Sequence, residues 1–395
     1  MAQDPTVLSL FSGAGGLDLG FAAAGFRSVG FVEIESWACE TLRANNPDAW
    51  VIGPPDYSGD INEIGAKELA KVSADLVSPD VVIGGPPCQP YSVAAAQRFL
   101  RGDDRFKRTG HADESRGGLF REFYRIVAET SPKAFVLENV PGLLELDDGA
   151  SIGAMVQDLE GLGYNVAVPS VVQAADFGVP QYRRRLFVLG ALKKAPQVPS
   201  GIFGNSDSLL PPHRTVAEAL ASMPASLPNN TPRNHANASI ARYKKLKFGE
   251  REKLGRVDRL DPYRPSKTVI AGGTKGGGRS HLHPFLARTL TVRECARLQT
   301  FPDSMVFNGN ISRQFTQVGN AVPPLLGEHM ARAVGTAMGM KFDTSPASAP
   351  YLERAEHLDD LVASLLEGAI AERSDWLYSD IDLPSSNASA LRAAA

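Results

Sequence analysis

The chain of 395 residues is 43% hydrophobic and 22% charged, enough apolar sequence for a sizeable core and more length than one core usually organises. No run approaches ~18 uninterrupted apolar residues, no signal peptide is evident, and three scattered cysteines contain no C-x-x-C pair, so we expect a cytoplasmic protein without membrane contact, disulfide framework or metal. The formal net charge of −3 conceals a basic segment, Arg183 to Arg313, with 23 lysines and arginines against 8 aspartates and glutamates, which is a candidate polyanion surface or a solvated charged face.

A glycine-rich turn follows the first predicted strand, Thr6 to Leu10. The turn and the helix that it opens, Phe11 to Gly20, allow a ligand close to the backbone because glycine has no Cβ. The spacing differs from the G-x-G-x-x-G of dinucleotide-binding proteins, which disfavours a nicotinamide-dependent oxidoreductase.

Two acidic residues follow at later strand ends. Glu33 comes after the second strand, Ser28 to Val32, where a carboxylate can bind both hydroxyls of a ribose. Asp60 is expected at the end of a third strand, placed to accept a hydrogen bond from an adenine amino group. Each acid alone would also suit a helix cap or the surface, but their order along a βαβ pattern predicts an adenosyl ligand.

A single cysteine lies on a stiff turn directly after the apolar run Val81 to Ile83. The turn reads Gly-Gly-Pro-Pro-Cys-Gln-Pro-Tyr-Ser, from Gly84 to Ser92. Two prolines fix the backbone before Cys88, so the thiol is held on a rigid loop where it can act as a nucleophile. A proline-rich turn with an incidental cysteine is the alternative.

The later strands, together with the earlier ones, indicate an α/β parallel sheet. Polar side chains lie next to these later strands. These strands are expected at Ala134 to Leu137, Tyr164 to Val172 and Leu186 to Leu189. Glu138 and Asn139 follow the first of them, at the edge where open α/β sheets place active sites. Arg183 and Arg185 enter the last strand and are expected to share one face, with a solvated edge as the alternative.

The basic segment contains lysines beside aromatic residues. Lys244, Lys245 and Lys247 lie around Tyr243 and Phe248, a mixture that favours DNA or RNA as a partner. A glycine-rich stretch from Ala271 to Arg279 is either a flexible linker or backbone that enters a nucleic-acid groove, and we favour the groove.

Two histidines and a C-terminal helix complete the pattern. His281 and His283 are expected to face DNA or to be structural, because no third residue has the spacing of a metal ligand. Leu352 to Glu372 has leucines at helical spacing, which predicts a packing helix followed by a frayed tail, with a partner-binding segment as the alternative.

The motifs occur in the order and spacing of one known family: the chain resembles a DNA (cytosine-5)-methyltransferase of the bacterial restriction-modification type. The motifs are Phe11 to Gly16, Glu33, Asp60, Pro87-Cys88-Gln89, Glu138-Asn139-Val140, Gln181-x-Arg183-x-Arg185, Arg288 to Glu294, and Gln317 to Pro324. The resemblance implies an α/β fold, with a Rossmann-like S-adenosylmethionine-dependent methyltransferase sheet and a smaller, irregular target-recognition domain. The implied domains are a catalytic domain at 1–190 completed by 312–342, a target-recognition domain at 191–311, and a C-terminal helix and acidic tail at 343–395.

The resemblance implies a catalytic role for four residues. Carbon 5 of cytosine is too poor a nucleophile to attack a sulfonium methyl group unaided, and a thiolate that adds to carbon 6 makes the ring enamine-like. That thiolate would be Cys88, while Glu138, protonated or sharing a proton, would hydrogen-bond the ring nitrogen and the exocyclic amine. Arg185, with Arg183 beside it, would hold the carbonyl oxygen and offset the developing charge.

S-adenosylmethionine is the methyl donor that the resemblance implies, without a metal. Glu33 would take the ribose, Asp60 the adenine amino group, and Ile34 and Ile61 would sandwich the adenine. The methionine and sulfonium end would lie against Phe11, Gly13 and Gly16. The pocket would be closed by Pro87, Leu119, Asn320 and Val322.

The implied substrate is double-stranded DNA, with the target base flipped out because the duplex hides carbon 6. The polar stretch from Pro90 to Ser115 is then a candidate lid that closes on DNA, with plain disorder as the competing interpretation. Specificity is expected to lie between Ala191 and Ala287. The residues expected to contact DNA are Gln89, Ser92, Lys244, Lys245, Lys247 and Arg279.

Three other functions compete with this one, and the oxidoreductase is already disfavoured by the first glycine turn. An RNA cytosine methyltransferase of the same fold is disfavoured by the long recognition segment, and a catalytically dead DNA-binding paralogue by the intact Cys88, Glu138 and Arg185. A monomer in the bacterial cytoplasm, associated with the nucleoid, is expected, and any cognate restriction endonuclease would act separately.

Overall fold

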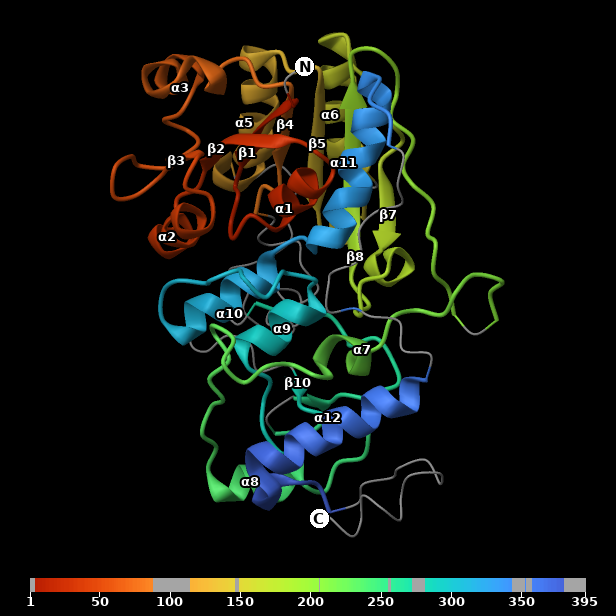
Figure 1. Cartoon of the computed structure of the whole chain (residues 1–395). Coiled ribbons are helices and arrows are strands. Elements are labelled where there is room, and N and C mark those ends of the chain that lie inside the picture. The colour runs from red at the N-terminus through yellow and green to blue at the C-terminus, as the bar shows by residue number, and fades with distance from the viewer. Residues whose placement is uncertain are drawn as a thin grey trace. The chain divides into compact units, whose positions relative to one another are not determined.

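The computed structural model describes residues 4–87, 114–145, 149–205, 207–254, 257–271, 281–342, 352 and 357–379. The chain divides into two compact units, whose elements are labelled in Figure 1. The first unit comprises Met1–Gln173, Arg184–Gly201 and Leu326–Ala347. The second comprises Ala174–Arg183, Ile202–Leu325 and Ser348–Ala395.

The first unit is built on one sheet, which has eight strands in the described part of the chain. The strands are β1 (Thr6–Leu10), β2 (Arg27–Val32), β3 (Trp50–Ile52), β4 (Val81–Gly84), β5 (Ala134–Asn139), β6 (Asn165–Val166), β7 (Ser170–Gln173) and β8 (Arg184–Ala191). Their spatial order is β3-β2-β1-β4-β5-β8-β6, with β7 paired to β8. The first five are parallel, whereas β8 is antiparallel to β5, β6 and β7. Strand order reverses between β1 and β4, and the carboxyl ends of strands at such a switch point form the ligand crevice of open α/β sheets.

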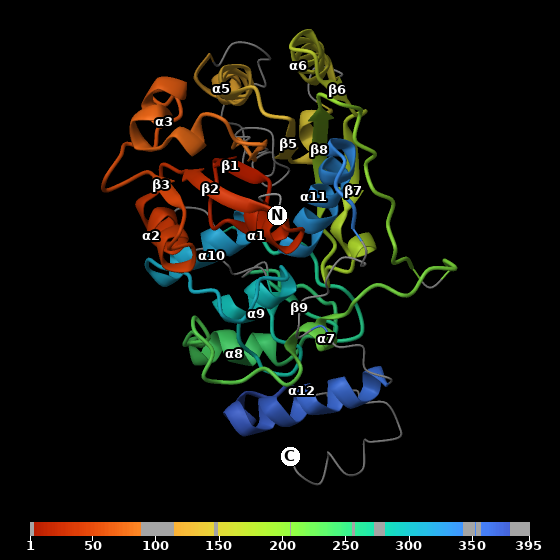
Figure 2. The same ribbon diagram turned by 45° about the horizontal axis from the view of Figure 1, so that its top comes forward.

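Helices cover both faces of this sheet. They are α1 (Gly16–Ala23), α2 (Ser36–Asn45), α3 (Ala66–Val72), α5 (Glu114–Thr130), α6 (Ala150–Gly161) and α11 (Pro324–Met338), with short 3-10 turns η1 (Ala74–Leu76) and η3 (Pro141–Leu143). Figures 1 and 2 together place α3, α5 and α6 on one face and α1, α2 and α11 on the other. All residues of β4 and β5 are buried, which explains the apolar runs Val81 to Ile83 and Ala134 to Leu137. The expected α/β fold is confirmed.

Two local predictions for this unit were wrong. The strand expected at Tyr164 to Val172 is split into β6 and β7, because the chain leaves the sheet at Val168, which is 80% exposed, and at a proline that cannot donate to the ladder. Asp60 does not end a strand, since β3 stops at Ile52 and Asp60 lies in the loop beyond it.

The second unit is largely irregular. Its regular elements are η5 (Ala174–Phe177), α7 (Val216–Leu220), α8 (Asn237–Tyr243), β9 (Asp258–Arg259), β10 (His281–Leu282), α9 (Val292–Leu298), α10 (Ile311–Asn320), α12 (Leu358–Arg373) and η6 (Ser374–Trp376). Strands β9 and β10 form a short parallel pair. No helix in the described part of either unit is long and apolar enough to cross a membrane.

Buried arginines hold this irregular backbone together. Arg183, Arg259, Arg288 and Arg293 are each at most 1% exposed. Arg293, for example, donates to the carbonyl oxygens of Pro228, Pro302 and Met305. A guanidinium carries five donors in a fixed fork, so it can satisfy several carbonyls that have no sheet or helix partner.

The two units divide the chain differently from the expected domains. Residues 174–183 and 312–325 lie in the second unit, although both were expected to belong to the catalytic domain. Residues 191–201 lie in the first unit instead of the recognition domain. Helix α12 belongs to the second unit and buries Val362, Leu365, Leu366 and Ala369.

Candidate active site

Residues with positive φ shape the turn between β1 and α1. Gly13 and Gly15 have φ of 53° and 76°, which glycine adopts without strain. Phe11 has φ of 54°, a left-handed conformation that is costly for a residue with a side chain and that clusters at functional sites. A Cβ on Gly13 would meet no atom within 4 Å, so a ligand can approach the backbone from this side.

Glu33, after β2, ties this turn to the neighbouring strand. Its Oε2 accepts the backbone N–H of Gly13 at 2.7 Å, and its Oε1 accepts that of Glu35 at 2.9 Å. Burial raises the pKa of the Glu33 carboxyl, and the backbone N–H groups around it oppose that shift. Each oxygen keeps acceptor capacity for a hydroxyl, because a carboxylate oxygen has two lone pairs.

Gly59 brings the loop after β3 against β2. A Cβ on Gly59, whose φ is +72°, would lie 2.1 Å from the carbonyl oxygen of Glu33 and 2.9 Å from Cα of Ile34. Only glycine permits this approach, which places Asp60 beside both residues. Asp60 uses Oδ1 to accept from the backbone and side-chain nitrogens of Asn62, at 3.0 and 2.7 Å. Its Oδ2 has no hydrogen-bond partner in the part of the chain that the structure describes.

These groups fit an adenosine. Two adjacent carboxylates can accept from ribose hydroxyls and from an amino group, and Ile34, 56% exposed, offers apolar surface to a base. Ile61, expected on the other side of the adenine, is 3% exposed and packs into the core of the first unit.

The other residues expected around the cofactor have different surroundings. In the first unit, Gly16 is buried at the start of α1, Leu119 packs against the core from α5, and Pro87 is exposed. In the second unit, Asn320 is exposed and Val322 is buried.

The turn that leads to the cysteine is anchored on β5. The side-chain amide of Asn139 donates to the carbonyl oxygen of Pro86 at 2.9 Å, in a buried position. A Cβ on Gly85 would lie 2.9 Å from Oε2 of Glu138, so the backbone passes directly beside that carboxylate. Cys88, Gln89 and Ser92, together with the candidate lid, lie outside the described residues apart from the start of α5.

Glu138 and Arg185 form a partly shielded ion pair on neighbouring strands. Nε of Arg185 lies 2.9 Å from Oε1 of Glu138, with side-chain exposures of 14% and 10%. Burial lowers the pKa of Arg185, and the charge of Glu138 opposes that shift. A carboxylate and a guanidinium thus stand together at the carboxyl end of β5, beside the backbone of the cysteine turn.

Arg183 has other partners. It lies before β8, and its guanidinium donates to the carbonyl oxygens of Val269, Gly319 and Ala321 at 3.0, 2.8 and 2.9 Å, all within the second unit. Arg183 and Arg185 were expected to share one face of a strand; the strand begins at Arg184, and the two guanidinium groups have different partners.

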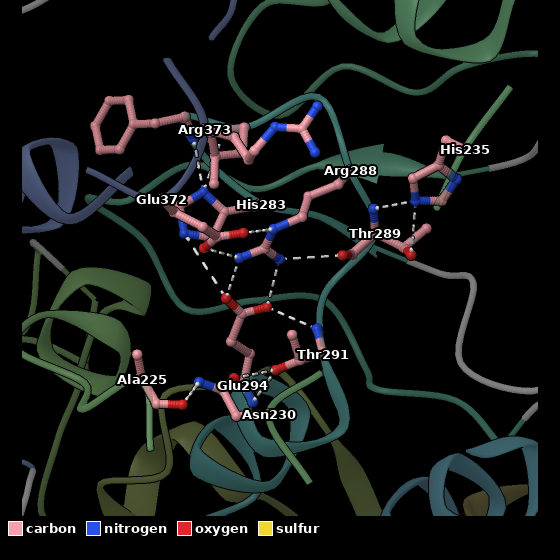
Figure 3. Close-up of polar contacts among 12 residues, drawn as sticks. Ala225, Asn230, His235, His283, Arg288, Thr289, Thr291, Glu294, Glu372 and Arg373 are labelled. Atoms are coloured by element: carbon pink, nitrogen blue, oxygen red, sulfur yellow. Dashed lines mark hydrogen bonds and ion pairs between the residues drawn. The ribbon is translucent and has the colours of Figure 1, made fainter. Parts of the chain in front are cut away.

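A buried charge cluster, drawn in Figure 3, lies in the second unit. Arg288 donates to both oxygens of Glu294 at 2.8 and 2.9 Å and to both oxygens of Glu372 on α12 at 2.8 Å. Although burial opposes ionisation of the Glu294 carboxyl, the charge of Arg288 lowers its pKa to about 2. Glu294 also accepts the backbone N–H of Thr291, so one carboxylate caps α9 and neutralises the arginine.

The three lysines expected to bind DNA differ in exposure and in their contacts within the protein. Lys245 and Lys247 are exposed, whereas the ammonium of Lys244 donates to the carbonyl oxygen of Asp375 at 2.7 Å. Of the neighbouring aromatic rings, Tyr243 is 7% exposed, and the half-buried Phe248 stacks on the guanidinium of Arg259. Arg279 and the glycine-rich stretch from Gly272 lie outside the described residues.

His281 and His283 are structural. They are 2% and 4% exposed, and burial lowers their pKa values to about 4 and about 3, which keeps both rings neutral. Nδ1 of His283 accepts the backbone N–H of Phe285 and Leu286. Within the described residues, no group of three or more histidine, cysteine, aspartate and glutamate side chains could hold a metal.

Asn139 was expected at the active-site edge of the sheet, but its contact was not: it anchors the cysteine turn. Two other residues that build the site were not singled out from the sequence. Gly59 lets the loop approach β2 closely enough to place Asp60 there, and the sequence feature that could have indicated it is the Gly-Asp pair typical of turns. Arg125 holds the loop after Asp60 from a distant helix, for which no local pattern exists.

Comparison with known proteins assigns this arrangement to a family. The family model for the C-5 cytosine-specific DNA methylases matches residues 6–336. Type II methyltransferase M1.HphI of Haemophilus parahaemolyticus is 36% identical over 345 residues, covering 83% of this chain and 86% of that protein. Type II methyltransferase M.NgoFVII of Neisseria gonorrhoeae is 33% identical over 353 residues, covering 84% and 87%.

Solved structures give the same result for the fold. A prophage-encoded Escherichia coli protein, described as a DNA modification methyltransferase, matches with a TM-score of 0.67 and 27% identity over 85% of this chain and 100% of its own. The Schizosaccharomyces pombe Dnmt2 methyltransferase matches with a TM-score of 0.60 at 17% identity, over 85% of this chain and 100% of its own, which is a likeness of fold alone.

Proposed function

The chain belongs to the C-5 cytosine-specific DNA methylase family and is a DNA (cytosine-5)-methyltransferase, and we propose that its chemistry takes place at the carboxyl ends of β4 and β5. The observation that carries this proposal is the position of Glu138. Its carboxylate lies between the backbone of the cysteine turn at Gly85 and the guanidinium of Arg185.

Cys88 is the proposed nucleophile, and its thiolate adds to carbon 6 of a cytosine flipped out of the duplex. Glu138, once it carries a proton, donates to the ring nitrogen and accepts from the exocyclic amine, and Arg185 donates to the carbonyl oxygen, so charge that develops on the ring meets fixed donors. The ion pair of 2.9 Å preorganises these two groups before the base arrives. Arg183, buried among backbone carbonyls, supports the chain that leads into β8 and acts on the base through Arg185.

The glycine turn, Glu33, Ile34 and Asp60 are proposed to hold the cofactor. S-adenosylmethionine, when bound, supplies an electrophilic methyl group. Glu33 binds the ribose through the lone pairs that its backbone contacts leave, and Asp60 uses its unpaired oxygen for the adenine amino group. Ile34 covers one face of the adenine.

DNA is the proposed target in a restriction-modification setting in the bacterial cytoplasm, with an endonuclease that acts separately. The relatives named Type II methyltransferases and the basic excess between Arg183 and Arg313 support this proposal. The recognition function falls to the second unit, and a monomer suffices because both sets of groups belong to one chain.

The test is methylation by the full chain with S-adenosylmethionine, offered duplex DNA and, separately, RNA. We expect 5-methylcytosine at one recurring sequence in the DNA, read by bisulfite sequencing, and none with Cys88→Ser. Methylated RNA with unmodified DNA would overturn the choice of substrate. No transfer to either by a well-folded parent would favour the catalytically dead DNA-binding protein.

A further inference from the structure

Arg125 on α5 donates hydrogen bonds to the loop that carries Asp60. Its Nη2 donates to the carbonyl oxygens of Ile61 and Ile64, each at 2.8 Å. Ile61 follows Asp60 directly, so the guanidinium fixes the backbone one residue beyond the carboxylate. The side chains of Ile61 and Ile64 are 3% and 5% exposed, so the core holds them while Arg125 holds the carbonyls.

Two carboxylates orient the guanidinium of Arg125. Nε of Arg125 donates to Glu122 at 2.7 Å and Nη1 donates to Glu129 at 2.9 Å, both on the same helix. The other oxygen of Glu129 accepts the backbone N–H of Ala66 at 2.7 Å. Every arm of the fork therefore has a partner, and the geometry is specific to arginine because a lysine has no planar fork.

The polar bridge lies at the wall of an open pocket. Residues 62–68 line this pocket of about 480 Å³ together with Arg125 and Glu129. Gly65 permits the approach, since a Cβ there would lie 2.9 Å from Oε2 of Glu129 and 3.1 Å from Nη1 of Arg125.

We propose that Arg125 is a positioning residue for adenine recognition, which holds Asp60 in register with Glu33 and Ile34; this rests on the proposed role of Asp60 in binding the cofactor. Gly59 fixes the backbone on one side of Asp60 and Arg125 fixes it on the other. Without Arg125, the loop keeps its apolar anchors but no longer has the hydrogen bonds to its carbonyls that orient the carboxylate.

The experiment measures base preference by calorimetric titration of the full chain. The probes are S-adenosylhomocysteine and S-inosylhomocysteine, which replaces the adenine amino group by a carbonyl oxygen. The parent should prefer the adenine form by about tenfold or more, because one charge-assisted hydrogen bond is at stake. Arg125→Gln should reduce that preference to within about twofold, and Asp60→Asn should do the same. The double variant should show no further loss, since both residues act through one contact.

Asp80→Asn is the matched control. Asp80 accepts from the backbone N–H of Thr6 at 2.8 Å and pairs with Lys133, at the amino ends of the strands and away from the ligand edge. The Asp80→Asn variant should be less stable than the parent and keep the parent's preference for adenine. Arg125→Lys keeps a cation, but its three donors cannot serve Glu122, Glu129 and both carbonyls together, so it should fold and still lose part of the preference.

The outcomes separate this inference from the proposed function. Full adenine preference in Arg125→Gln, or in a folded Arg125→Lys if the glutamine variant does not fold, would overturn the inference and leave the cofactor site intact. Equal binding of both probes by the parent would overturn the contact through Asp60, and with it the inference, while cofactor binding stands. No binding of either probe by the parent would overturn both.

Discussion

At the scale of single residues, Asp18 is an ionisable group that the fold keeps neutral. It lies in the first turn of α1, is 4% exposed, and accepts the hydroxyl of Ser9 at 3.0 Å through one oxygen. Its other oxygen has no hydrogen-bond partner in the described structure. Burial raises the pKa of Asp18 from its usual 3.8 to about 7, although the Ser9 hydroxyl opposes the shift.

Asp18→Asn should therefore change how stability depends on pH. The folded parent keeps a proton that the unfolded chain releases above about pH 4, so the parent loses about 1.4 kcal/mol per pH unit as pH rises toward about 7. Asparagine carries no such proton, so the stability of the variant relative to the parent should rise from pH 5 to pH 7 and stay constant above pH 7. Urea unfolding at pH 5, 7 and 8 measures this, with the exposed Asp75→Asn as control. A constant difference between variant and parent would show that Asp18 is ionised throughout.

The active-site residues show what a sequence can and cannot reveal at this scale. The sequence could mark Glu33, Asp60 and Glu138 as candidates because each comes at the end of an apolar run or directly after a glycine. Arg183 and Arg185 alternate in the sequence, yet Arg183 binds carbonyls as far along the chain as Ala321. Pairing of this kind depends on tertiary contacts, which no local pattern encodes.

At the scale of elements, the joint between α9 and α12 depends on one arginine. Arg288 is 1% exposed and lies between Glu294, itself 2% exposed, and Glu372, whose side chain is 34% exposed. The two carboxylates are not equivalent, because Glu372 can exchange its contact for water whereas Glu294 cannot.

Glu294→Gln should thus cost much more stability than Glu372→Gln. Loss of the buried carboxylate leaves Arg288 with only the more exposed Glu372, and the amide offers one acceptor oxygen where the carboxylate's two served Arg288 and Thr291, a loss worth about 3–5 kcal/mol. Loss of the exposed partner should cost about 1 kcal/mol or less. Chemical denaturation at pH 7 measures both losses of stability. Equal losses would mean that the contact of Arg288 with Glu372 on α12 stabilises the protein as much as its contact with Glu294.

Strand prediction succeeded for most of the central parallel strands and failed at Tyr164 to Val172 and in the region of β3. β1, β2, β4 and β5 stand where their valines, leucines and isoleucines predict them. β3 is only three residues long, so the loop that carries Asp60 was mistaken for a strand end. The second unit offers little strand periodicity to read, because its apolar core is assembled from loops and short helices, with buried arginines that satisfy the loop carbonyls.

At the scale of the whole molecule, the basic excess of the segment from Arg183 to Arg313 is partly internal. Many of its arginines are buried against carbonyls or carboxylates, and Lys244 donates to Asp375. Lys245 and Lys247 remain exposed and are the better probes of DNA contact.

Lys245→Gln with Lys247→Gln should weaken binding to any DNA sequence, because phosphate contacts position a protein without reading bases. For each phosphate that the variant no longer neutralises, the slope of log affinity against log salt should become shallower by about 0.9. Fluorescence anisotropy over a salt series measures both effects on specific and unrelated duplexes. Lys71→Gln with Lys133→Gln, two exposed lysines of the first unit, is the control. An unchanged salt slope in the first pair would move the DNA contact elsewhere.

The central claim is that Cys88 attacks carbon 6 of cytosine in duplex DNA, and a covalent trap tests it most directly. In a duplex whose target cytosine carries fluorine at carbon 5, fluorine replaces the hydrogen that must leave as a proton and cannot itself leave as a cation, so the bond from sulfur to carbon 6 persists after methyl transfer. With S-adenosylmethionine, the parent should form a protein–DNA adduct that survives denaturing electrophoresis, and Cys88→Ser should form none. An active parent that methylates ordinary DNA but forms no adduct, or a Cys88→Ser variant that forms one equally well, would contradict the claim.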